Sequence, residues 1–340
     1  FSDSDLGAFA AGWHLGKSEL PATRLANLIS LKHPLSVDTY AQKTLSGSRA
    51  ILIRLIGGMS YWPYGLQQIR KLSEEKGIAL AVLPADRRVD SQLDEISTLP
   101  LSTLRQLAML CDIGGAEATK AALGQLALAA GLYAKPTLVT KTFPKFGNWT
   151  NKGGISHPKS IVCRSEKKPL VIITFYLSFL TSADLDPLVK LSETLIHNGF
   201  EAIGLFAPSL KDPKASKWIE EEIRRLKPEI IVNMTAFSGI GPNGLSPLDA
   251  GGVPVFQMAL ATSTRKNWIN AERGLSPADL AMHVVLPEVD GRLSGGIGSF
   301  KQACKRDQDL EYSRFAHQAD IGRMKALIGR IAAHVSLQSK

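Results

Sequence analysis

The stretch Leu170-Val-Ile-Ile-Thr-Phe-Tyr176 opens the part of the chain that decides its fold class. Its β-branched and aromatic residues favour a strand. Asp186-Pro187, a cap followed by a first-turn proline, predicts a helix that ends at Gly199 and has a buried stripe of Leu188, Leu191 and Leu195. The next strand is expected at 202–207. Because parallel strands require a crossover, this order predicts a parallel sheet.

The same alternation continues toward the C-terminus. A helix around Trp218, with Ile219, Ile223 and Leu226 inward, is stopped by Pro228. Apolar runs predict further strands at 230–235, 253–260 and 282–286. The final helix has an inward face formed by Ile321, Met324, Ile328, Ile331 and Val335. Strands that alternate with helices at this spacing indicate a doubly wound sheet.

The first part of the chain predicts a second unit of the same type. A strand at 51–56 is followed by Gly57-Gly58 and by a helix with Leu66, Ile69 and Leu72 inward; a strand at 78–83 comes next. Two helices follow Pro100, the second at 117–132, and residues 1–5 resemble the exit of a strand. We expect an α/β protein with two doubly wound parallel-sheet domains, of the Rossmann or flavodoxin-like type, and a long C-terminal helix. The expected boundaries are 1–140, a basic linker at 141–168, and 169–340.

Composition excludes several classes of protein. The 340 residues are enough for about two domains with their own cores. No apolar run approaches the ~20 residues of a membrane span, and no signal-peptide pattern opens the chain. Three scattered cysteines argue against a disulfide framework and for a reducing compartment, so a cytoplasmic location is expected. Because the chain does not begin with Met, we expect a fragment or a processed form.

The net charge of +9 is concentrated in the expected linker. Residues 141–168 contain seven Lys or Arg and one Glu, interleaved with Phe143, Phe146 and Trp149. Cations with aromatic residues are compatible with nucleic-acid binding by phosphate contacts and stacking. The prolines and glycines of the segment favour a solvated connector instead. A positive rim that attracts an anionic substrate is a third interpretation.

Common catalytic motifs are missing from the sequence. It contains no Gly-x-x-x-x-Gly-Lys-Ser/Thr loop, no Gly-x-Ser-x-Gly elbow and no histidine pair at metal-ligand spacing, so no metal site is predicted. Gly295-Gly296-Ile297-Gly298 is interpreted as a flexible loop, and Gly57-Gly58 as a tight turn or an anion contact. His283, inside the expected strand at 282–286, is interpreted as a core histidine.

Polar residues follow three of the predicted strands. Leu286-Pro-Glu-Val-Asp-Gly-Arg292 places two carboxylates and a guanidinium after the strand at 282–286. Because the carboxyl ends of parallel strands share one edge of a sheet, these groups are expected to converge with those after the third and fourth strands. The candidate ligand contacts are Asn233, Thr235, Arg265, Glu288, Asp290 and Arg292. The alternative is a charged turn closed by Asp290-Gly291.

Several longer segments resemble the large subunit of cobaltochelatase, CobN, in the family that also includes the large subunit of magnesium chelatase. The resemblance covers essentially the whole chain, and the later segments are its more specific part. The segments are Phe1-Ser-Asp-Ser-Asp-Leu-Gly7, Arg24-Leu-Ala-Asn27, His33-Pro-Leu-Ser-Val-Asp38, Gly65-Leu-Gln-Gln68, Asn233-Met-Thr-Ala-Phe-Ser238, Ser246-Pro-Leu-Asp249, Gly274-Leu-Ser-Pro-Ala-Asp279 and Leu286-Pro-Glu-Val-Asp-Gly-Arg292.

The resemblance implies a role in cobalamin (vitamin B12) biosynthesis. The family's large subunit binds hydrogenobyrinic acid a,c-diamide and cobalt, which is a substrate, and acts as a ligase forming nitrogen–metal bonds. Partner subunits of the CobS and CobT type, one a ring-forming ATPase, hydrolyse ATP with Mg. The missing nucleotide loop fits this division of labour. The family's His-Gly-x-x-Glu motif followed by Pro-Gly-Lys does not occur here, so the chelation centre is expected outside this fragment, which we expect to be inactive alone.

Two departures and two alternatives accompany the resemblance. Family members tend to have Phe-Tyr-Arg-Ser where this chain has Leu177 in place of Arg, and Met234 stands where a small residue is usual. In this interpretation Arg265 and Arg292 pair with the macrocycle's peripheral carboxylates. Glu288 or Asp290 accepts protons or contacts the macrocycle's amide groups. The alternatives are a magnesium-chelatase large subunit that binds protoporphyrin, and a non-catalytic docking module for the ATPase subunits.

Overall fold

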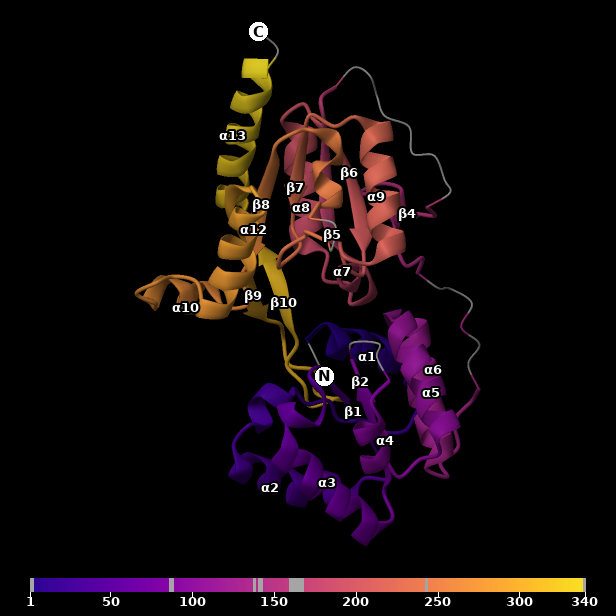
Figure 1. Ribbon diagram of the computed structural model, residues 1–340. Helices are drawn as coiled ribbons and strands as arrows, with labels where there is room; N and C mark the ends of the chain where they lie inside the picture. Colours follow the sequence, from indigo (N-terminus) through magenta and orange to yellow (C-terminus); the bar gives the residue numbers. More distant parts are fainter. Residues whose placement is uncertain are drawn as a thin grey trace. The chain divides into compact units, whose positions relative to one another are not determined.

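The computed structural model describes residues 3–338 apart from 86–88, 137–138, 140–142, 159–167 and 242–243. The chain forms two compact units (Figure 1). Unit 1 is made of Phe1–Phe143, Thr181–Ala183 and Lys305–Arg314, and unit 2 of Pro144–Leu180, Asp184–Cys304 and Phe315–Lys340. Residues 305–314 were expected in the second domain and instead belong to unit 1. Among the described residues, no helix is long and apolar enough to cross a membrane.

Unit 2 contains the expected parallel sheet. Its strands lie in the order β10-β9-β8-β7-β5-β6-β3-β4. The five strands from β6 to β9 are mutually parallel, and their order β6-β5-β7-β8-β9 is that of a flavodoxin-like doubly wound sheet. At the two ends of the sheet, β10 pairs antiparallel with β9, β3 with β6, and β4 with β3. The bounds are β3 Gly147–Thr150, β4 Gly154–Ser156, β5 Leu170–Tyr176, β6 Glu201–Ala207, β7 Ile230–Asn233, β8 Val255–Leu260, β9 Leu293–Ala303 and β10 Phe315–Ala319.

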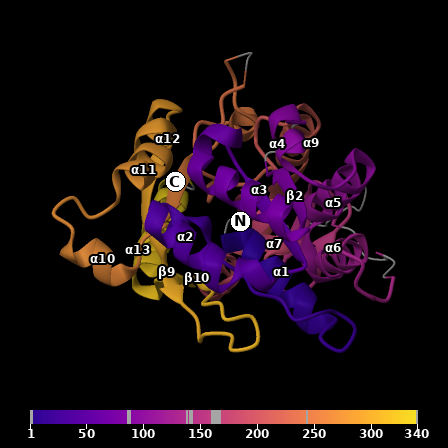
Figure 2. The same cartoon turned by 90° about the horizontal axis from the view of Figure 1, so that it is seen from below.

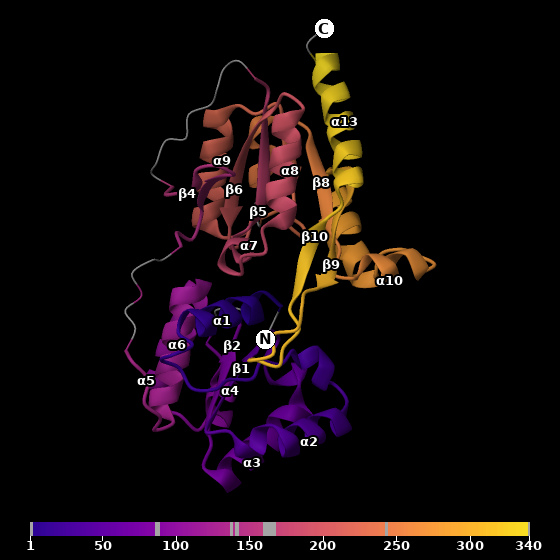
Figure 3. The ribbon, with the colours of Figure 1, turned by 180° about the vertical axis from the view of Figure 1, so that it is seen from behind.

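Helices cover both faces of this sheet. On one face α9 packs with η4 over apolar side chains of four strands, among them Ile172, Leu205 and Ile231. The opposite face carries α8 and α13, which contact each other (Figure 3). The expected long C-terminal helix is therefore confirmed. The helices are α7 Leu177–Thr181, α8 Asp186–His197, α9 Pro213–Leu226, η4 Pro247–Gly251, α10 Arg265–Asn270, α11 Pro277–Leu280, η5 Ala281–Val285, α12 Leu286–Val289 and α13 Ile321–Gln338.

The capping residue of α8 was predicted wrongly. Asp186 is the first residue of the helix, and Leu185 is its N-cap. The Asp186 carboxylate instead accepts a hydrogen bond from the backbone N–H of Ala319 at 2.7 Å. The predicted inward stripe is correct, since Leu188, Leu191 and Leu195 are all buried.

The segment 282–286 is not a strand. Ala281–Val285 forms a π-helical turn that continues into α12, so Glu288 and Asp290 follow a helix and precede β9. Within the turn His283 is buried, whereas Val285 is half exposed. Short apolar runs of this length do not distinguish a strand from a helix, because the periodicity cannot be read over five residues.

The glycine-rich segment at 295–298 is not a flexible loop but the centre of β9. A Cβ on Gly295 would lie 2.5 Å from the carbonyl oxygen of Gln257, and one on Gly298 would overlap the Met258 side chain. The glycines therefore allow the backbone of β9 to approach β8 closely. Glycine in the interior of a strand marks such a close approach. The fifth parallel strand of the sheet is therefore β9, and not the expected strand at 282–286.

Part of the expected basic linker is folded into the sheet. β3 and β4 form a hairpin whose first strand pairs with β6, and Trp149 is buried against Phe175. Phe146 packs on Trp218 at a ring-centroid distance of 5.4 Å. These two aromatic side chains belong to packing contacts and do not line a stacking surface for nucleic acid. Lys141, Lys159, Arg164 and Lys167 lie outside the described residues.

Unit 1 is built around a short parallel pair, β1 Ala50–Leu55 and β2 Ala79–Pro84, joined by α3 Pro63–Lys76. This strand–helix–strand unit was predicted, and Gly77 ends α3 with a φ of 65°. Figure 2 shows α5 and α6 side by side, and α1 also contacts α6. The remaining elements are α1 Asp3–Leu15, η1 Leu28–Leu31, α2 Pro34–Lys43, η2 Leu45–Gly47, η3 Gly58–Tyr61, α4 Ser91–Ile96, α5 Leu101–Ile113 and α6 Gly115–Ala129.

A buried arginine connects the elements of unit 1. Arg54 of β1, with a side chain 5% exposed, binds Asp5 of α1 at 2.6 Å and Asp112 of α5 at 3.0 Å. Removal of either acid would leave charge uncompensated in a buried position. The N-terminal acidic segment is helical from Asp3 onward, since Asp5 lies in α1. Phe1 and Ser2, the start of the segment expected to leave a strand, lie outside the described residues.

The packing of α8 gives a test of the sheet's covering layer. Leu195 is fully buried and its neighbour Ile196 is 42% exposed. We expect Leu195→Ala to lower the free energy of unfolding of unit 2 by about 2–5 kcal/mol, because a cavity remains. Ile196→Ala should change it by no more than about 0.5 kcal/mol. Chemical denaturation measures both, and equal losses would contradict this packing.

Candidate functional site

Two of the predicted contacts, Asn233 and Thr235, lie together in a buried polar network at the carboxyl end of β7. The Asn233 Oδ1 accepts hydrogen bonds from the hydroxyls of Thr174 at 2.7 Å and Thr235 at 2.9 Å. Its amide donates to Gln257 Oε1 at 2.7 Å, and Gln257 in turn donates to the Thr235 carbonyl. All four residues are at most 3% exposed. These groups therefore connect β5, β7 and β8 through their own side chains.

The neighbouring switch point of the sheet, between β5 and β7, is also occupied by the protein itself. In flavodoxin-like sheets, ligands bind where the strand order reverses. Here the Tyr176 hydroxyl donates to the Ala236 carbonyl at 2.7 Å and accepts from the Ala236 N–H at 3.2 Å. Burial is the main cause that raises the pKa of Tyr176, so the phenol is neutral and able to donate. The Tyr176 side chain and the backbone of the loop after β7 thus occupy the usual ligand position.

Asp290 and Arg292 hold the long connection between β7 and β8. The Asp290 carboxylate accepts from the Ser238 hydroxyl and the Gly239 N–H, both at 2.7 Å. Arg292, whose side chain is 5% exposed, binds Asp249 at 2.5 Å. The charged stretch at 286–292 therefore holds the β7–β8 connection in place through these hydrogen bonds and this ion pair. The Arg292 Nη2 has no hydrogen-bond partner among the described residues, which leaves one buried donor available.

Arg265 lies at a different place, beside a polar hollow of about 410 Å³. The hollow collects the residues that follow β8, the end of β9 and the end of β10. Arg265 is 63% exposed and lies 3.4 Å from the Asp320 carboxylate. The lining carries three cationic groups, one acid and two amides: Thr264, Arg265, Lys266, Phe300, Lys301, Gln302, Ala303, Gln318, Ala319 and Asp320.

The neighbourhood of the hollow fixes the position of its charges. Asp320 also lies 3.7 Å from Arg323, whose guanidinium stacks over the Trp268 ring at 4.4 Å. Lys301, largely buried, reaches Asp184 at 3.7 Å. An exposed Arg and Lys beside amide side chains can bind a carboxylate through charge-assisted hydrogen bonds. The hollow is thus suited to a carboxylate-bearing ligand.

The six predicted contacts therefore do not form one site. Asn233 and Thr235 share a network, Asp290 and Arg292 hold the same connection, and Arg265 belongs to the hollow. Glu288 is exposed on α12. Sequence reasoning missed Lys301, Gln302 and Gln318, since it predicted neither β9 nor β10. β10 has five residues, Phe315–Ala319, and no clear apolar alternation, so the sequence carries no distinct signal for it.

Asp184 links Lys301 of the hollow's lining to a buried cluster of titratable groups. His317 Nδ1 is 3.0 Å from the Ser299 hydroxyl, and its backbone N–H donates to Asp184. Burial, with smaller contributions from the charges of Lys301 and His283, lowers the pKa of His317 to about 3. Burial also lowers the pKa of His283, and Asp279 opposes this shift. Both imidazoles are therefore neutral near neutral pH.

The π-helical turn gives His283 an unusual setting. Its Nδ1 and the Oδ1 of Asp279 are buried without hydrogen-bond partners among the described residues. The other Asp279 oxygen accepts from both the N–H and the hydroxyl of Thr262. π-Helical turns occur frequently at functional sites, where they change the direction of side chains. In the described part of the chain, no three His, Cys, Asp or Glu residues are placed to hold a metal ion.

The buried imidazole predicts acid sensitivity in unit 2. Below about pH 6.5 the unfolded chain protonates His317, whereas the folded chain does so only near 3, so the unfolded state binds more protons. The free energy of unfolding should fall as the pH falls through this window, by up to about 1.4 kcal/mol per pH unit from this residue.

Denaturation of His317→Gln across the same pH range isolates this contribution. The variant should lose that part of the slope below pH 6.5, because Gln does not titrate. His197→Gln, on the exposed end of α8, is the matched control and should keep the parent slope. A parent-like slope in His317→Gln would show that the buried ring is not the source of the acid sensitivity.

Comparisons with known proteins agree with this architecture. A family model described as CobN/Magnesium Chelatase matches residues 106–340. The chain is 30% identical over 336 residues to a protein from Sinorhizobium sp. named aerobic cobaltochelatase subunit CobN, covering 95% of this chain and 26% of that protein. A protein of the same name from Pseudomonas aeruginosa is 29% identical over 337 residues, with the same two coverages.

A solved structure supports the same fold. The structure titled catalytic subunit of cobaltochelatase from Mycobacterium tuberculosis aligns with a TM-score of 0.61 at 20% identity, covering 95% of this chain and 26% of that one. The chain thus spans about a quarter of the length of these relatives. The α/β fold class predicted from the sequence is confirmed, and so is the resemblance to CobN. The chain belongs to the CobN/magnesium chelatase family.

Proposed function

We propose that this chain is a section of the large subunit of an ATP-dependent cobaltochelatase, which inserts cobalt into hydrogenobyrinic acid a,c-diamide in cobalamin biosynthesis. The observation that carries the proposal is the similarity to two CobN subunits over 95% of the chain. The names of these relatives favour cobalt over magnesium and protoporphyrin. Because the chain covers 26% of each relative, the complete activity belongs to a longer polypeptide.

In this proposal unit 2 contributes contacts to the macrocycle's periphery. The corrin precursor carries carboxylate and amide side chains around its ring. The hollow offers the exposed Arg265 and Lys266 for carboxylates, and Gln302 and Gln318 for amides. Such contacts hold and orient the ring. They do not supply the ring-nitrogen chemistry, for which the expected chelation centre lies outside this section.

The six residues predicted from the sequence have unequal roles in the proposal. Arg265 and Glu288 are exposed and can contact the ring's substituents directly. Arg292 adds one buried donor, its Nη2. Asn233, Thr235 and Asp290 use their polar atoms within the protein and act by positioning the strand ends.

The energy for insertion comes from other chains in this proposal. The sequence has no Gly-x-x-x-x-Gly-Lys-Ser/Thr loop, so ATP and Mg would be used by partner subunits of the CobS and CobT type. Cobalt is a substrate of the complex and not a resident cofactor of this section.

Titration of the 340-residue chain with hydrogenobyrinic acid a,c-diamide, followed by its visible spectrum, tests the proposal. We expect a saturable spectral shift that protoporphyrin does not reproduce. Arg265→Ala should weaken binding by about three- to tenfold, because one exposed charge-assisted contact is lost. Arg224→Ala, on α9 and paired with Glu220, is the matched control and should bind like the parent.

Three results would contradict parts of the proposal. Preference for protoporphyrin would assign the chain to the magnesium branch. No spectral shift, together with retained binding to the ATPase subunits, would make it a docking module. Unchanged affinity in a folded Arg265→Ala variant would exclude the hollow as the ring contact while leaving the family assignment intact.

A further inference from the structure

The carboxylate of Asp320 belongs both to the lining of the polar hollow and to the start of α13, which it immediately precedes. Its Oδ1 accepts a hydrogen bond from the Arg323 N–H at 3.2 Å, as the side chain of a helix N-cap does. The Asp320 N–H donates to the Gly298 carbonyl of β9 at 2.8 Å, which fixes the backbone of the same residue. These two bonds determine where the second carboxylate oxygen, Oδ2, lies.

The Asp320 Oδ2 atom is buried and accepts no hydrogen bond from the described residues. Arg265 Nη1 at 3.4 Å and Arg323 Nε at 3.7 Å bring positive charge near it without forming that bond. Arg323 is held at this distance because its guanidinium stacks over the Trp268 ring, 4.4 Å from the centroid. A buried carboxylate oxygen is costly unless a donor reaches it. Asp320 therefore offers an unused acceptor at the hollow.

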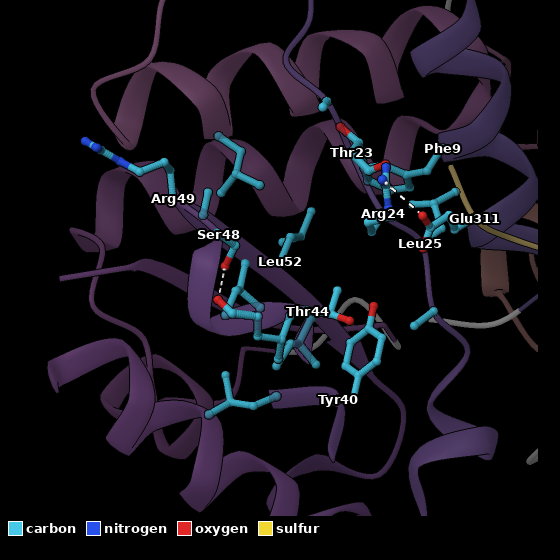
Figure 4. A pocket seen from close by; sticks show the side chains of 18 of the residues that line it. Phe9, Thr23, Arg24, Leu25, Tyr40, Thr44, Ser48, Arg49, Leu52 and Glu311 are labelled. Atoms are coloured by element: carbon cyan, nitrogen blue, oxygen red, sulfur yellow. Dashed lines mark hydrogen bonds and ion pairs between the residues drawn. The ribbon is translucent and has the colours of Figure 1, made fainter. Parts of the chain in front are cut away.

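A similar pair of charges in unit 1 shows why burial matters at Asp320. Arg24 lies 3.2 Å from Glu311 in the lining of a cavity of about 700 Å³ (Figure 4). The Glu311 side chain is 54% exposed, so water can donate to its oxygens. The Asp320 side chain is only 9% exposed, and its Oδ2 is covered. A ligand that brings a donor to Asp320 thus supplies an interaction that the protein alone does not make.

Arg265 couples the two halves of such a ligand. Its side chain is 63% exposed, so it can turn toward a ligand carboxylate without unpacking a core. When it does so, Asp320 loses one of its two neighbouring cations, while Arg323 stays on Trp268. The buried carboxylate then needs a donor more than before. An N–H group on the same ligand meets that need, so binding of a carboxylate and binding of an amide support each other.

The strands that border the hollow add amide groups on the same side. Gln318 of β10 lies opposite Phe300 of β9, so their side chains share one face of the sheet. Gln302, two residues farther along β9, belongs to that face as well. Lys301 points to the other face, where it reaches Asp184 at 3.7 Å. Because glutamine amides both donate and accept hydrogen bonds, this face suits an amide-bearing ligand.

We propose that Asp320 is a specificity-determining residue of the hollow, which selects a ligand with a carboxylate and a primary amide close together. The carboxylate binds Arg265, and the amide N–H donates to Asp320 Oδ2. A second carboxylate in place of the amide meets the buried negative charge and is repelled. The exposed Lys266 does not reverse this order, since water screens surface ion pairs.

This inference rests on the function proposed above and deepens it. The hollow then distinguishes a macrocycle whose peripheral side chains are partly amidated from one in which the corresponding side chains are free acids. The cations bind the carboxylates that remain, and Asp320 recognises the amide. The single buried acid thus determines which of two closely similar precursors unit 2 accepts.

Three small compounds test the preference without the macrocycle: adipic acid monoamide, adipate and adipamide. In NMR titrations of the 340-residue chain at neutral pH, the monoamide should shift the backbone amide signals of residues 264–266, 302–303 and 318–320. It should bind at least about fivefold more tightly than adipate, because only its amide donates to Asp320. Adipamide has no charge for Arg265 and should also bind more weakly. Equal affinities for monoamide and adipate, or no saturable shift with any of the three, would overturn the inference.

Asp320→Asn separates the proposed role from that of a helix cap. Asn caps helices as well as Asp does, so its oxygen keeps the bond to the Arg323 N–H and its Nδ2 takes the place of Oδ2. The acceptor becomes a donor, so the variant should lose the preference and bind adipate at least about fivefold more tightly than the parent does. Asp212→Asn, at the N-cap of α9 and outside the lining, is the matched control and should keep the parent's preference. A parent-like preference in Asp320→Asn would overturn the inference.

The outcomes distinguish this inference from the proposed function. A monoamide preference that Asp320→Asn removes, with no spectral shift on addition of the corrin precursor, would contradict the macrocycle contact while the selectivity of the hollow stands. A spectral shift with the precursor, together with equal affinities for monoamide and adipate, would overturn the role of Asp320 and leave the proposed function intact. The comparison on the parent chain decides the inference even if the variant does not fold.

Discussion

The hydrogen-bond network centred on Asn233 is the constraint on which the arrangement of unit 2 depends. Its amide group lies between Thr174 of β5 and Gln257 of β8, and it satisfies both at distances of 2.7 Å. A buried polar group is stable only when its partners are supplied, so the network fixes the relative positions of three adjacent strands. The carboxyl ends of these strands are thus held by the protein's own side chains, at the place where related sheets bind ligands.

The position of the polar hollow is related to the occupied crevice between β5 and β7. With the β5–β7 crevice occupied by Tyr176 and Ala236, exposed polar groups remain at the ends of β8, β9 and β10. The antiparallel strand β10 extends the sheet beyond the doubly wound core and brings Gln318 and Asp320 beside Arg265.

Much of the fold could be predicted because its main helices and central strands carry long, regular patterns. The stripe Leu188, Leu191 and Leu195 spans two turns, and it is buried as expected. The wrong predictions concern segments whose hydrophobic pattern is short, or whose residue type is common in two kinds of structure. Met282–Leu286 is apolar for five residues only, and the glycines of 295–298 serve close strand approach as readily as a loop. With β9 misplaced, the predicted convergence of the six contacts could not be correct in detail.

Candidate site residues were harder to predict than the fold for a related reason. A polar residue at a strand end can bind a ligand or a neighbouring strand, and the sequence does not distinguish the two. Asn233 and Asp290 bind neighbours, whereas Arg265 remains exposed. The family resemblance, in contrast, rested on sequence segments spread over the whole chain and was confirmed.

Hydrogen-exchange mass spectrometry with and without bound hydrogenobyrinic acid a,c-diamide tests the central claim most directly. Ligand should slow exchange in the segments that border the hollow, 264–266, 301–303 and 318–320, and leave 174–176 and 233–236 unchanged. Protection confined to 174–176 and 233–236 would place the macrocycle at the switch point and contradict the account.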